Sequence, residues 1–188
     1  MCSLELAAEH QHLIEPEKRK LVCACDACAL LFTTQAGTKL RRVPRRVREL
    51  TNFRLADQQW GSLMIPIELA FFFNSSPQGR VVAFYPSPAG ATESLLALES
   101  WNDIVSDNPV LAEMLPDVEA LLVNRVGAAR GVAPEYYIAP IDLCYRLVGL
   151  IRMHWRGLSG GTEMWREISA FFSALKQNAE VPKEMENA

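Results

Sequence analysis

Cysteine and histidine gather at the start of this chain. Four of the five cysteines and two of the three histidines fall within the first 28 residues. Cys25 and Cys28 form a C-x-x-C motif, whose two intervening residues let both sulfurs turn toward one tetrahedral ion. The sequence therefore predicts a structural metal site near the N-terminus. The candidate ligands are Cys2, His10, His12, Cys23, Cys25 and Cys28.

Spacing alone leaves the full ligand set open. Cys25 and Cys28 are the expected first pair, and Cys2 is the expected third ligand. The fourth ligand is one of His10, His12 and Cys23. Zinc accepts such a mixed set, whereas iron in a rubredoxin-like setting would need all four N-terminal thiolates. Without a metal, the cysteines would be small buried apolar side chains, although a strand face favours branched aliphatic residues instead.

The segment between the histidines and the C-x-x-C is typical of a short hairpin. Apolar and polar residues alternate on both sides of a turn-like Glu-Pro-Glu-Lys at 15–18. If Ile14 faces Arg19, counting outward along the strands places His10 opposite Cys23. That position is the open end of the hairpin, where the C-x-x-C begins. His10 is therefore the better placed of the two histidines to bind a metal.

The whole chain has the composition of an ordinary globular protein. It has 188 residues, 49% of them apolar, and a net charge of −3. These values exclude a disordered chain and one coated by nucleic acid. No segment reaches the roughly 20 consecutive apolar residues that cross a bilayer, so no membrane insertion is expected. Because the first residues also lack the pattern of a secretory signal, we expect a cytoplasmic protein with reduced thiols.

The chain predicts an α+β fold, in which a small N-terminal zinc-knuckle-like hairpin precedes a mainly antiparallel sheet packed with helices. We divide it into a Cys/His metal-binding knuckle at 1–36, an α+β body at 37–180 and a frayed tail at 181–188. Thr92 and Thr162 are the expected N-caps of two helices. The predicted strands lie at 67–74, 80–87, 119–126 and 135–140, and the predicted helices at 55–63, 91–107, 140–156 and 163–177.

A basic run follows the knuckle, with six basic residues within ten positions. Such a run can bind phosphates or an acidic protein surface, and in most proteins it is a solvated face. Phe53 is the only aromatic residue close to it, so bases would find no platform on which to stack. Nucleic-acid binding is therefore not expected. The six residues are Lys39, Arg41, Arg42, Arg45, Arg46 and Arg48.

The remaining cysteine and histidine lie on a predicted helix near the C-terminal end. Cys144 and His154 are ten residues apart. That spacing is about 15 Å along a helix, too far for a nucleophile and its base. His154 flanks an apolar stripe, and Asp142 lies too far along the same helix to orient it. We interpret His154 as structural, and we expect no catalytic residues.

Seven segments together resemble one protein family over nearly the whole chain. They are EHQHL, LVCACDACALLF, FRLADQQW, IPIELAFFFNSS, GRVVAFYPSPAGATESLL, PDVEALLVNR and PIDLCYRLVGLIRMHWRGLSGG. The chain is similar to an uncharacterised domain-of-unknown-function family, whose members are typically encoded beside uptake nickel–iron hydrogenase genes. The resemblance implies a complete C-x-x-C whose second cysteine corresponds to Cys2. Either translation starts upstream of Met1, or His10 replaces the other cysteine.

The metal cluster and the resemblance together indicate a hydrogenase-associated accessory protein. It would carry a structural zinc ion and act by protein–protein interaction in assembly or maturation, with a hydrogenase subunit or a maturation protein as partner. One alternative is a metal-handling enzyme with an open coordination position, in which water joins Cys25, Cys28 and either Cys2 or His10. Another is an iron–thiolate electron-transfer protein.

Overall fold

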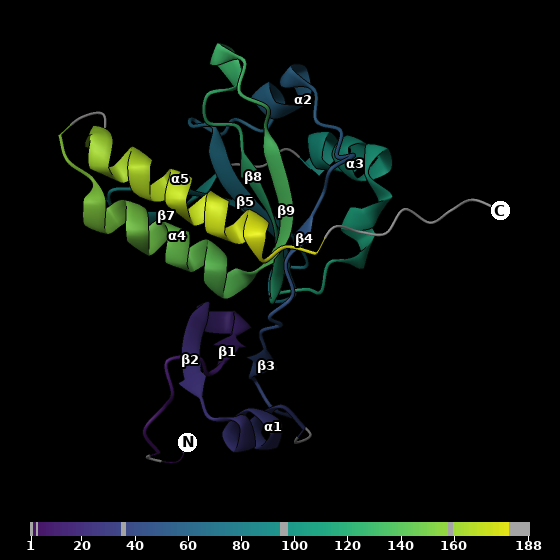
Figure 1. Ribbon diagram of the computed structural model, residues 1–188. Helices are drawn as coiled ribbons and strands as arrows, with labels where there is room; N and C mark the ends of the chain where they lie inside the picture. The colour runs from purple at the N-terminus through teal and green to yellow at the C-terminus, as the bar shows by residue number, and fades with distance from the viewer. Residues whose placement is uncertain (1, 3, 35–36, 95–97, 158–159, 181–188) are drawn as a thin grey trace.

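A six-stranded sheet forms the centre of the protein (Figure 1). All neighbouring strands in it are antiparallel. The computed structural model describes residues 2, 4–34, 37–94, 98–157 and 160–180. In spatial order the strands are β4 (Arg48–Glu49), β9 (Glu135–Pro140), β8 (Glu119–Asn124), β5 (Leu69–Ser75), β6 (Arg80–Ser87) and β7 (Gly90–Ser94).

Helices cover both faces of this sheet. Successive residues of a strand point to opposite faces, so Phe71 and Phe73 enter one core while Phe72 enters the other, where it stacks on Trp101. The helices on the first face, α4 (Ile141–His154) and α5 (Gly161–Gln177), lie side by side (Figure 1). On the second face lie α2 (Asp57–Ser62), α3 (Leu98–Asp107) and the short η2 (Pro109–Glu113), while η3 (Ala128–Arg130) follows β8.

The predicted α+β class is confirmed, and so are the four strands and the two C-terminal helices. The sheet is wider than predicted, because β4 and β7 add one strand at each edge. The predicted helix start at 91 is wrong, since Gly90–Ser94 pairs with β6 and the helix begins at Leu98. The edge of β6 needs a hydrogen-bonding partner, and the Thr92 hydroxyl bonds Ser87 instead of capping a helix.

The helix predicted at 163–177 begins at Gly161, and its N-cap residue, Gly160, has a left-handed φ of 86°. Thr162 therefore lies inside the helix, contrary to the predicted capping role. The predicted tail at 181–188 lies outside the described residues. Within the described ranges, no helix is long and apolar enough to cross a membrane.

A smaller, three-stranded sheet with one helix forms the N-terminal lobe. Leu13 and Ala24 lie on the face of this sheet that packs on the helix, where they join Cys28 and Ala29 in a small core. The division of the chain at residue 36 stays a prediction. The elements are β1 (Gln11–Glu15), η1 (Pro16–Lys18), β2 (Lys20–Ala24), α1 (Asp26–Thr34) and β3 (Arg41–Arg42).

The predicted hairpin exists, but its predicted register is wrong. Ile14 pairs with Leu21 rather than Arg19, and His12 rather than His10 lies opposite Cys23. The turn is longer than expected, because η1 is followed by Arg19 with a left-handed φ of 50°. These residues connect the strands without pairing, and this moves the register of the whole hairpin.

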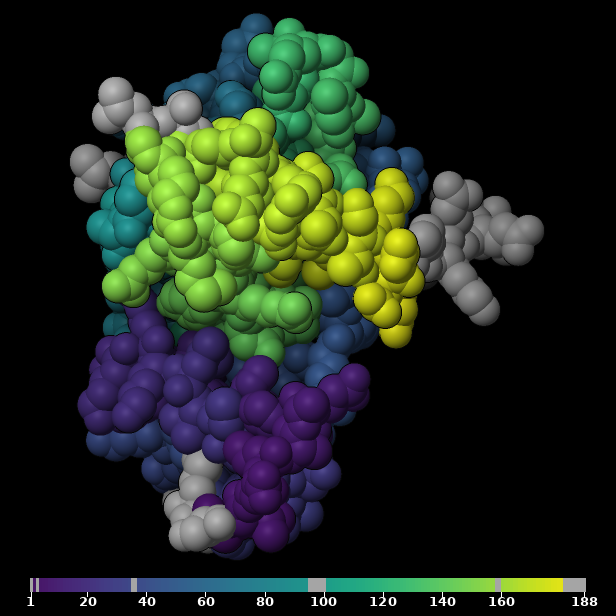
Figure 2. All heavy atoms as spheres, turned by 60° about the vertical axis from the view of Figure 1, so that its left-hand side comes forward, coloured from purple at the N-terminus to yellow at the C-terminus, as the bar shows by residue number. Residues whose placement is uncertain are grey.

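The N-terminal lobe packs directly against the body beneath α4 and α5 (Figure 2). The Ile14 side chain is buried in the core that the large sheet forms with α4 and α5. Arg19 contributes an ion pair with Glu93 of β7 at 3.0 Å, and its guanidinium lies 4.7 Å from the centre of the Phe84 ring. Apolar packing and charge therefore both hold the lobe in place.

The basic run contacts the rest of the protein through ion pairs and hydrogen bonds, although Arg41 and Arg46 stay 45% and 47% exposed. Arg42 donates to the side chain of Gln11 at 3.0 Å, within the lobe. Three other arginines of the run pair with carboxylates, two of which are almost fully buried. The pairs are Arg41 with Asp117 (2.8 Å), Arg46 with Glu119 (3.4 Å) and Arg48 with Glu113 (2.7 Å).

Candidate metal centre

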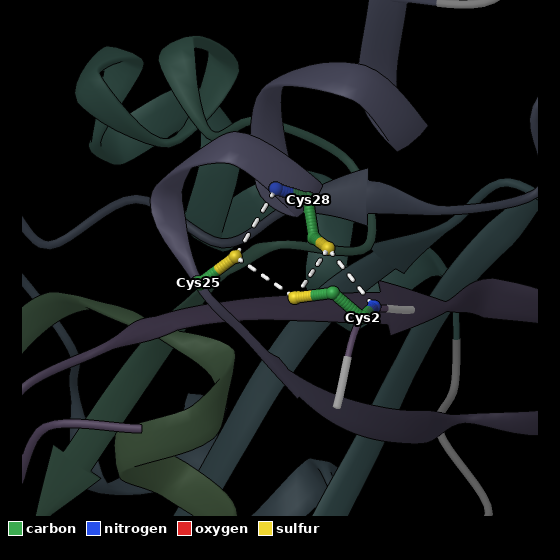
Figure 3. A group of neighbouring side chains, drawn as sticks. All are labelled: Cys2, Cys25 and Cys28. Atoms are coloured by element: carbon green, nitrogen blue, oxygen red, sulfur yellow. Dashed lines mark hydrogen bonds between the residues drawn. The ribbon is translucent and has the colours of Figure 1, made fainter. Parts of the chain in front are cut away.

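Three cysteines from two segments of the lobe meet at one point (Figure 3). Cys25 directly precedes α1, Cys28 lies in the first turn of α1, and Cys2 comes from the N-terminal segment. Cys2 Sγ is 3.5 Å from Cys25 Sγ and 3.4 Å from Cys28 Sγ. All three sulfurs lie within 4.8 Å of one another. We call Cys2, Cys25 and Cys28 the thiol triad.

These distances suit a tetrahedral metal ion. Zinc–sulfur bonds of about 2.3 Å place neighbouring sulfurs about 3.8 Å apart, whereas disulfide sulfurs are about 2 Å apart. Backbone groups also point at the sulfurs: the N–H of Cys28 donates to Cys25 Sγ, and the N–H of Cys2 donates to Cys28 Sγ, both at 3.4 Å. Because such hydrogen bonds favour the thiolate form, the triad has the donors and the geometry for three zinc ligands.

The members of the triad differ in exposure and in acidity. Cys28 is buried in the core of the lobe, whereas Cys2 is exposed. A backbone hydrogen bond from Leu4, followed by contacts with the other two thiols, lowers the pKa of Cys2. The backbone N–H of Cys2 acts to lower the pKa of Cys28, but the Cys2 thiol, burial and the Cys25 thiol together outweigh it and raise that pKa. A metal ion would therefore have to displace a proton from Cys28.

The two N-terminal histidines and Cys23 form a second group on the opposite face of the hairpin, which we call the histidine group. His12 lies directly opposite Cys23, and the ligand atoms of His10, His12 and Cys23 lie within 4.8 Å of one another. The Nδ1 atom of His12 is 2.5 Å from Asp142 Oδ2 at the start of α4. The Nδ1 atom of His10 is 2.8 Å from the carbonyl oxygen of Ala7.

Comparison with known protein families gives one match, to a family of unknown function designated DUF5947, over residues 1–179. The chain belongs to this family. A search of the curated proteins found no match, and a search of the solved structures found none either. DUF5947 is therefore the uncharacterised family that the sequence resembles, and nothing in these comparisons links it to hydrogenase genes.

In this DUF5947 chain the six predicted ligands form two groups instead of one. His10, His12 and Cys23, the expected sources of a fourth ligand for the triad, lie together in the histidine group. Among the described residues, no other Cys, His, Asp or Glu has a ligand atom within 4.8 Å of all three sulfurs of the triad. Strand alternation explains this division, because Cys23 and His12 point away from the face on which α1 carries Cys28.

Asp142 is the residue of this region that sequence reasoning missed. The sequence suggested only its relation to His154 on the same helix, whereas the structure places it against His12, 130 positions away. The Nδ1 atom of His154 lies 3.4 Å from Oε1 of Glu163 in α5 instead, a contact that agrees with a structural role. No local pattern could have paired Asp142 with His12, because their contact depends on how the lobe docks on the body.

Proposed function

We propose that this protein is a non-catalytic accessory protein, in which the thiol triad holds a structural zinc ion. The observation that carries the proposal is the convergence of the Cys2 sulfur, from the N-terminal segment, on the two sulfurs of the C-x-x-C, with Cys2 Sγ 3.5 and 3.4 Å from Cys25 Sγ and Cys28 Sγ. Apolar packing does not require sulfurs to face one another, whereas a shared metal ion does.

A structural role follows from the small core of the lobe. Its buried apolar residues are Leu13, Ala24, Cys28 and Ala29, two of them alanines. Units of this size usually depend on a metal or a disulfide, because their cores bury too little apolar surface. An ion at the triad would join the N-terminal segment, the end of β2 and the first turn of α1.

The geometry favours zinc over iron. A rubredoxin-like iron centre needs four thiolates, and the fourth N-terminal cysteine, Cys23, lies with the histidines on the other face. Zinc tolerates a fourth ligand of another kind, including water. The triad is therefore better suited to zinc than to an electron-transfer iron site.

We propose a hydrogenase subunit or a hydrogenase maturation protein as the partner, and this part of the proposal rests on the sequence resemblance alone. Nucleic acid is a poorer candidate. Three arginines of the basic run are engaged by Asp117, Glu119 and Glu113. A guanidinium that anchors the chain to its own body is less available to phosphates.

Replacement of one triad ligand tests the structural zinc. We expect Cys25→Ser to lose zinc from the triad and to unfold the lobe, because a structural site contributes its binding energy to folding. The NMR signals of β1, β2 and α1 should collapse while those of the large sheet persist. Thr34→Ala is the matched control, since Thr34 is an exposed residue of α1 in the same lobe and belongs to neither group of candidate ligands.

The measurement is zinc content per chain, together with NMR spectra of both variants. If the wild type binds no zinc, or if Cys25→Ser keeps the wild-type zinc content and a folded lobe, the structural role is wrong.

Deletion of the gene tests the partner. In a host that carries an uptake hydrogenase, we expect loss of hydrogenase activity with a normally folded large subunit. Unchanged activity would contradict the assembly role without affecting the metal site.

A metal-handling function is the second candidate, and the three-ligand triad is the observation that favours it. Three protein ligands with an open fourth position are typical of zinc sites that exchange a ligand. The same Cys25→Ser variant separates the two functions. A fully folded protein that has lost the ability to bind or transfer metal would indicate this second function.

A further inference from the structure

We propose that His10, His12 and Cys23 form a second metal site, distinct from the thiol triad, with an open coordination position that faces a cavity between the lobe and the body. Its ion would be zinc or a similar divalent transition metal, bound by two imidazole nitrogens and one thiolate. This inference does not depend on the thiol triad holding a metal.

The backbone brings the three ligands together. His12 and Cys23 are direct partners across β1 and β2, so their side chains leave the sheet on the same face. His10 lies just before β1, and its ring meets that of His12 edge to face with centroids 4.9 Å apart. The three ligand atoms lie within 4.8 Å of one another. One ion can therefore contact all three with little movement.

Each imidazole is held as metal-binding imidazoles usually are. A ligating histidine commonly gives one ring N–H to a carboxylate or a carbonyl, which leaves the other nitrogen for the metal. Here Nδ1 of His12 meets Asp142 Oδ2 at 2.5 Å, and Nδ1 of His10 meets the Ala7 carbonyl at 2.8 Å. Both rings therefore keep Nε2 for an ion.

The Nε2 atom of His10 is the observation that points to a ligand. It is buried and has no hydrogen-bond partner among the described residues. A buried polar atom without a partner costs stability, so such atoms call for an explanation. An ion pair between His12 and Asp142 that merely docks the lobe would account for neither this nitrogen nor the nearby Cys23 thiol. A shared metal ion accounts for both.

The site opens on a cavity of about 250 Å³, lined by His10, His12 and Asp142 together with Glu9 and Arg45. Three protein ligands leave the fourth position of a tetrahedral ion for water or another small ligand. The ion and the Arg45 guanidinium both attract negative charge, and of the two carboxylates that oppose it Asp142 is already paired with His12. We therefore assign the open position to water that a small anion can replace.

Metal titration of the full chain tests this site, with cobalt(II) as a coloured substitute for zinc. We expect two equivalents bound per wild-type chain and one in Cys23→Ser or His10→Ala. His154→Ala is the matched control, because it removes the remaining histidine and should leave two equivalents. Binding of one equivalent by the wild type, unchanged in Cys23→Ser and His10→Ala, would overturn the second site and leave the triad intact. One equivalent that those two variants abolish would support the second site and contradict the triad.

Azide tests the open position. It should shift the cobalt absorption of the wild type more than that of His10→Ala, in which any response comes from cobalt at the triad. Arg45→Ala should weaken the azide response without changing the number of cobalt ions bound. A wild-type spectrum that azide leaves unchanged would show the position to be closed and would overturn this part of the proposal.

Discussion

One carboxylate, that of Asp142, links the lobe to the body at the histidine group. Its Oδ1 accepts the backbone N–H of Leu143 at 2.9 Å, and its Oδ2 meets His12 at 2.5 Å. Its position in the first turn of α4 also favours a negative charge, because the N-terminal end of a helix is positive. The Oδ1 contact therefore fixes the carboxylate, and Oδ2 can orient the His12 imidazole.

Asp142→Asn should weaken cobalt binding at the histidine group by about 10–100-fold, since second partners of ligating histidines have effects of this size. The variant should keep its near-UV circular dichroism, because the amide can still accept hydrogen bonds. The measurement is the dissociation constant of the site in the full chain.

Glu163→Gln is the control for this variant, since it alters a different histidine–carboxylate contact, that of His154. An Asp142→Asn protein with unchanged cobalt affinity but reduced stability would show that Asp142 only docks the lobe.

At the scale of elements, the hairpin of β1 and β2 separates two chemical environments. On one face Leu13 and Ala24 pack against α1 in the small core that contains Cys28. On the other face lie Cys23 and His12, and His12 contacts Asp142 of the body. A single hairpin therefore serves both candidate metal centres, and its alternation keeps them apart.

Leu13→Ala should destabilise the lobe by about 2–5 kcal/mol, because it leaves a cavity in a core that has few other large side chains. Leu13 is 0% exposed. Hydrogen exchange of the amides in β1 and β2 measures the destabilisation locally. If a metal also stabilises the lobe, a chelator should raise the exchange rates further.

Val22→Ala is the matched variant, since Val22 is the cross-strand partner of Leu13 but only half-buried. We expect a clearly smaller loss. Equal losses for the two variants would mean that the small core does not determine the stability of the lobe.

At the scale of the whole molecule, charged anchors hold the connection between lobe and body. One of these anchors is Asp117, which pairs with Arg41 of the lobe at 2.8 Å. Its carboxylate also accepts hydrogen bonds from the backbone N–H of Ser76 at 2.8 Å and from the Ser76 hydroxyl at 2.6 Å. Its side chain is 3% exposed. The basic run is therefore part of the architecture.

Asp117→Asn should lower the free energy of unfolding by about 1–3 kcal/mol, because the buried amide cannot satisfy all the donors that face the carboxylate. Asparagine tolerates the left-handed backbone at this position, where φ is 67°, so the change tests charge rather than strain. Urea denaturation measures the loss. Asp103→Asn, on the exposed face of α3, is the control and should change little.

Local pattern was sufficient for much of this protein. The hairpin of β5 and β6 follows from apolar runs around a turn, and the C-x-x-C brought Cys25 and Cys28 together because their spacing is short. The sequence also limited the third sulfur to Cys2 or Cys23, the other two cysteines of the first 36 residues. These features depend on residues that are close in the chain.

Tertiary structure decided the rest. The register of β1 on β2 depends on the conformation of the turn, and it alone placed Cys23 with His12 instead of with the triad. Residues 90–94 became a strand because β6 offered an open edge, although their pattern also suits a helix. The contact between His12 and Asp142 exists only because the lobe docks on α4. None of these outcomes is encoded in the periodicity of one segment, because each depends on how that segment pairs or packs with another.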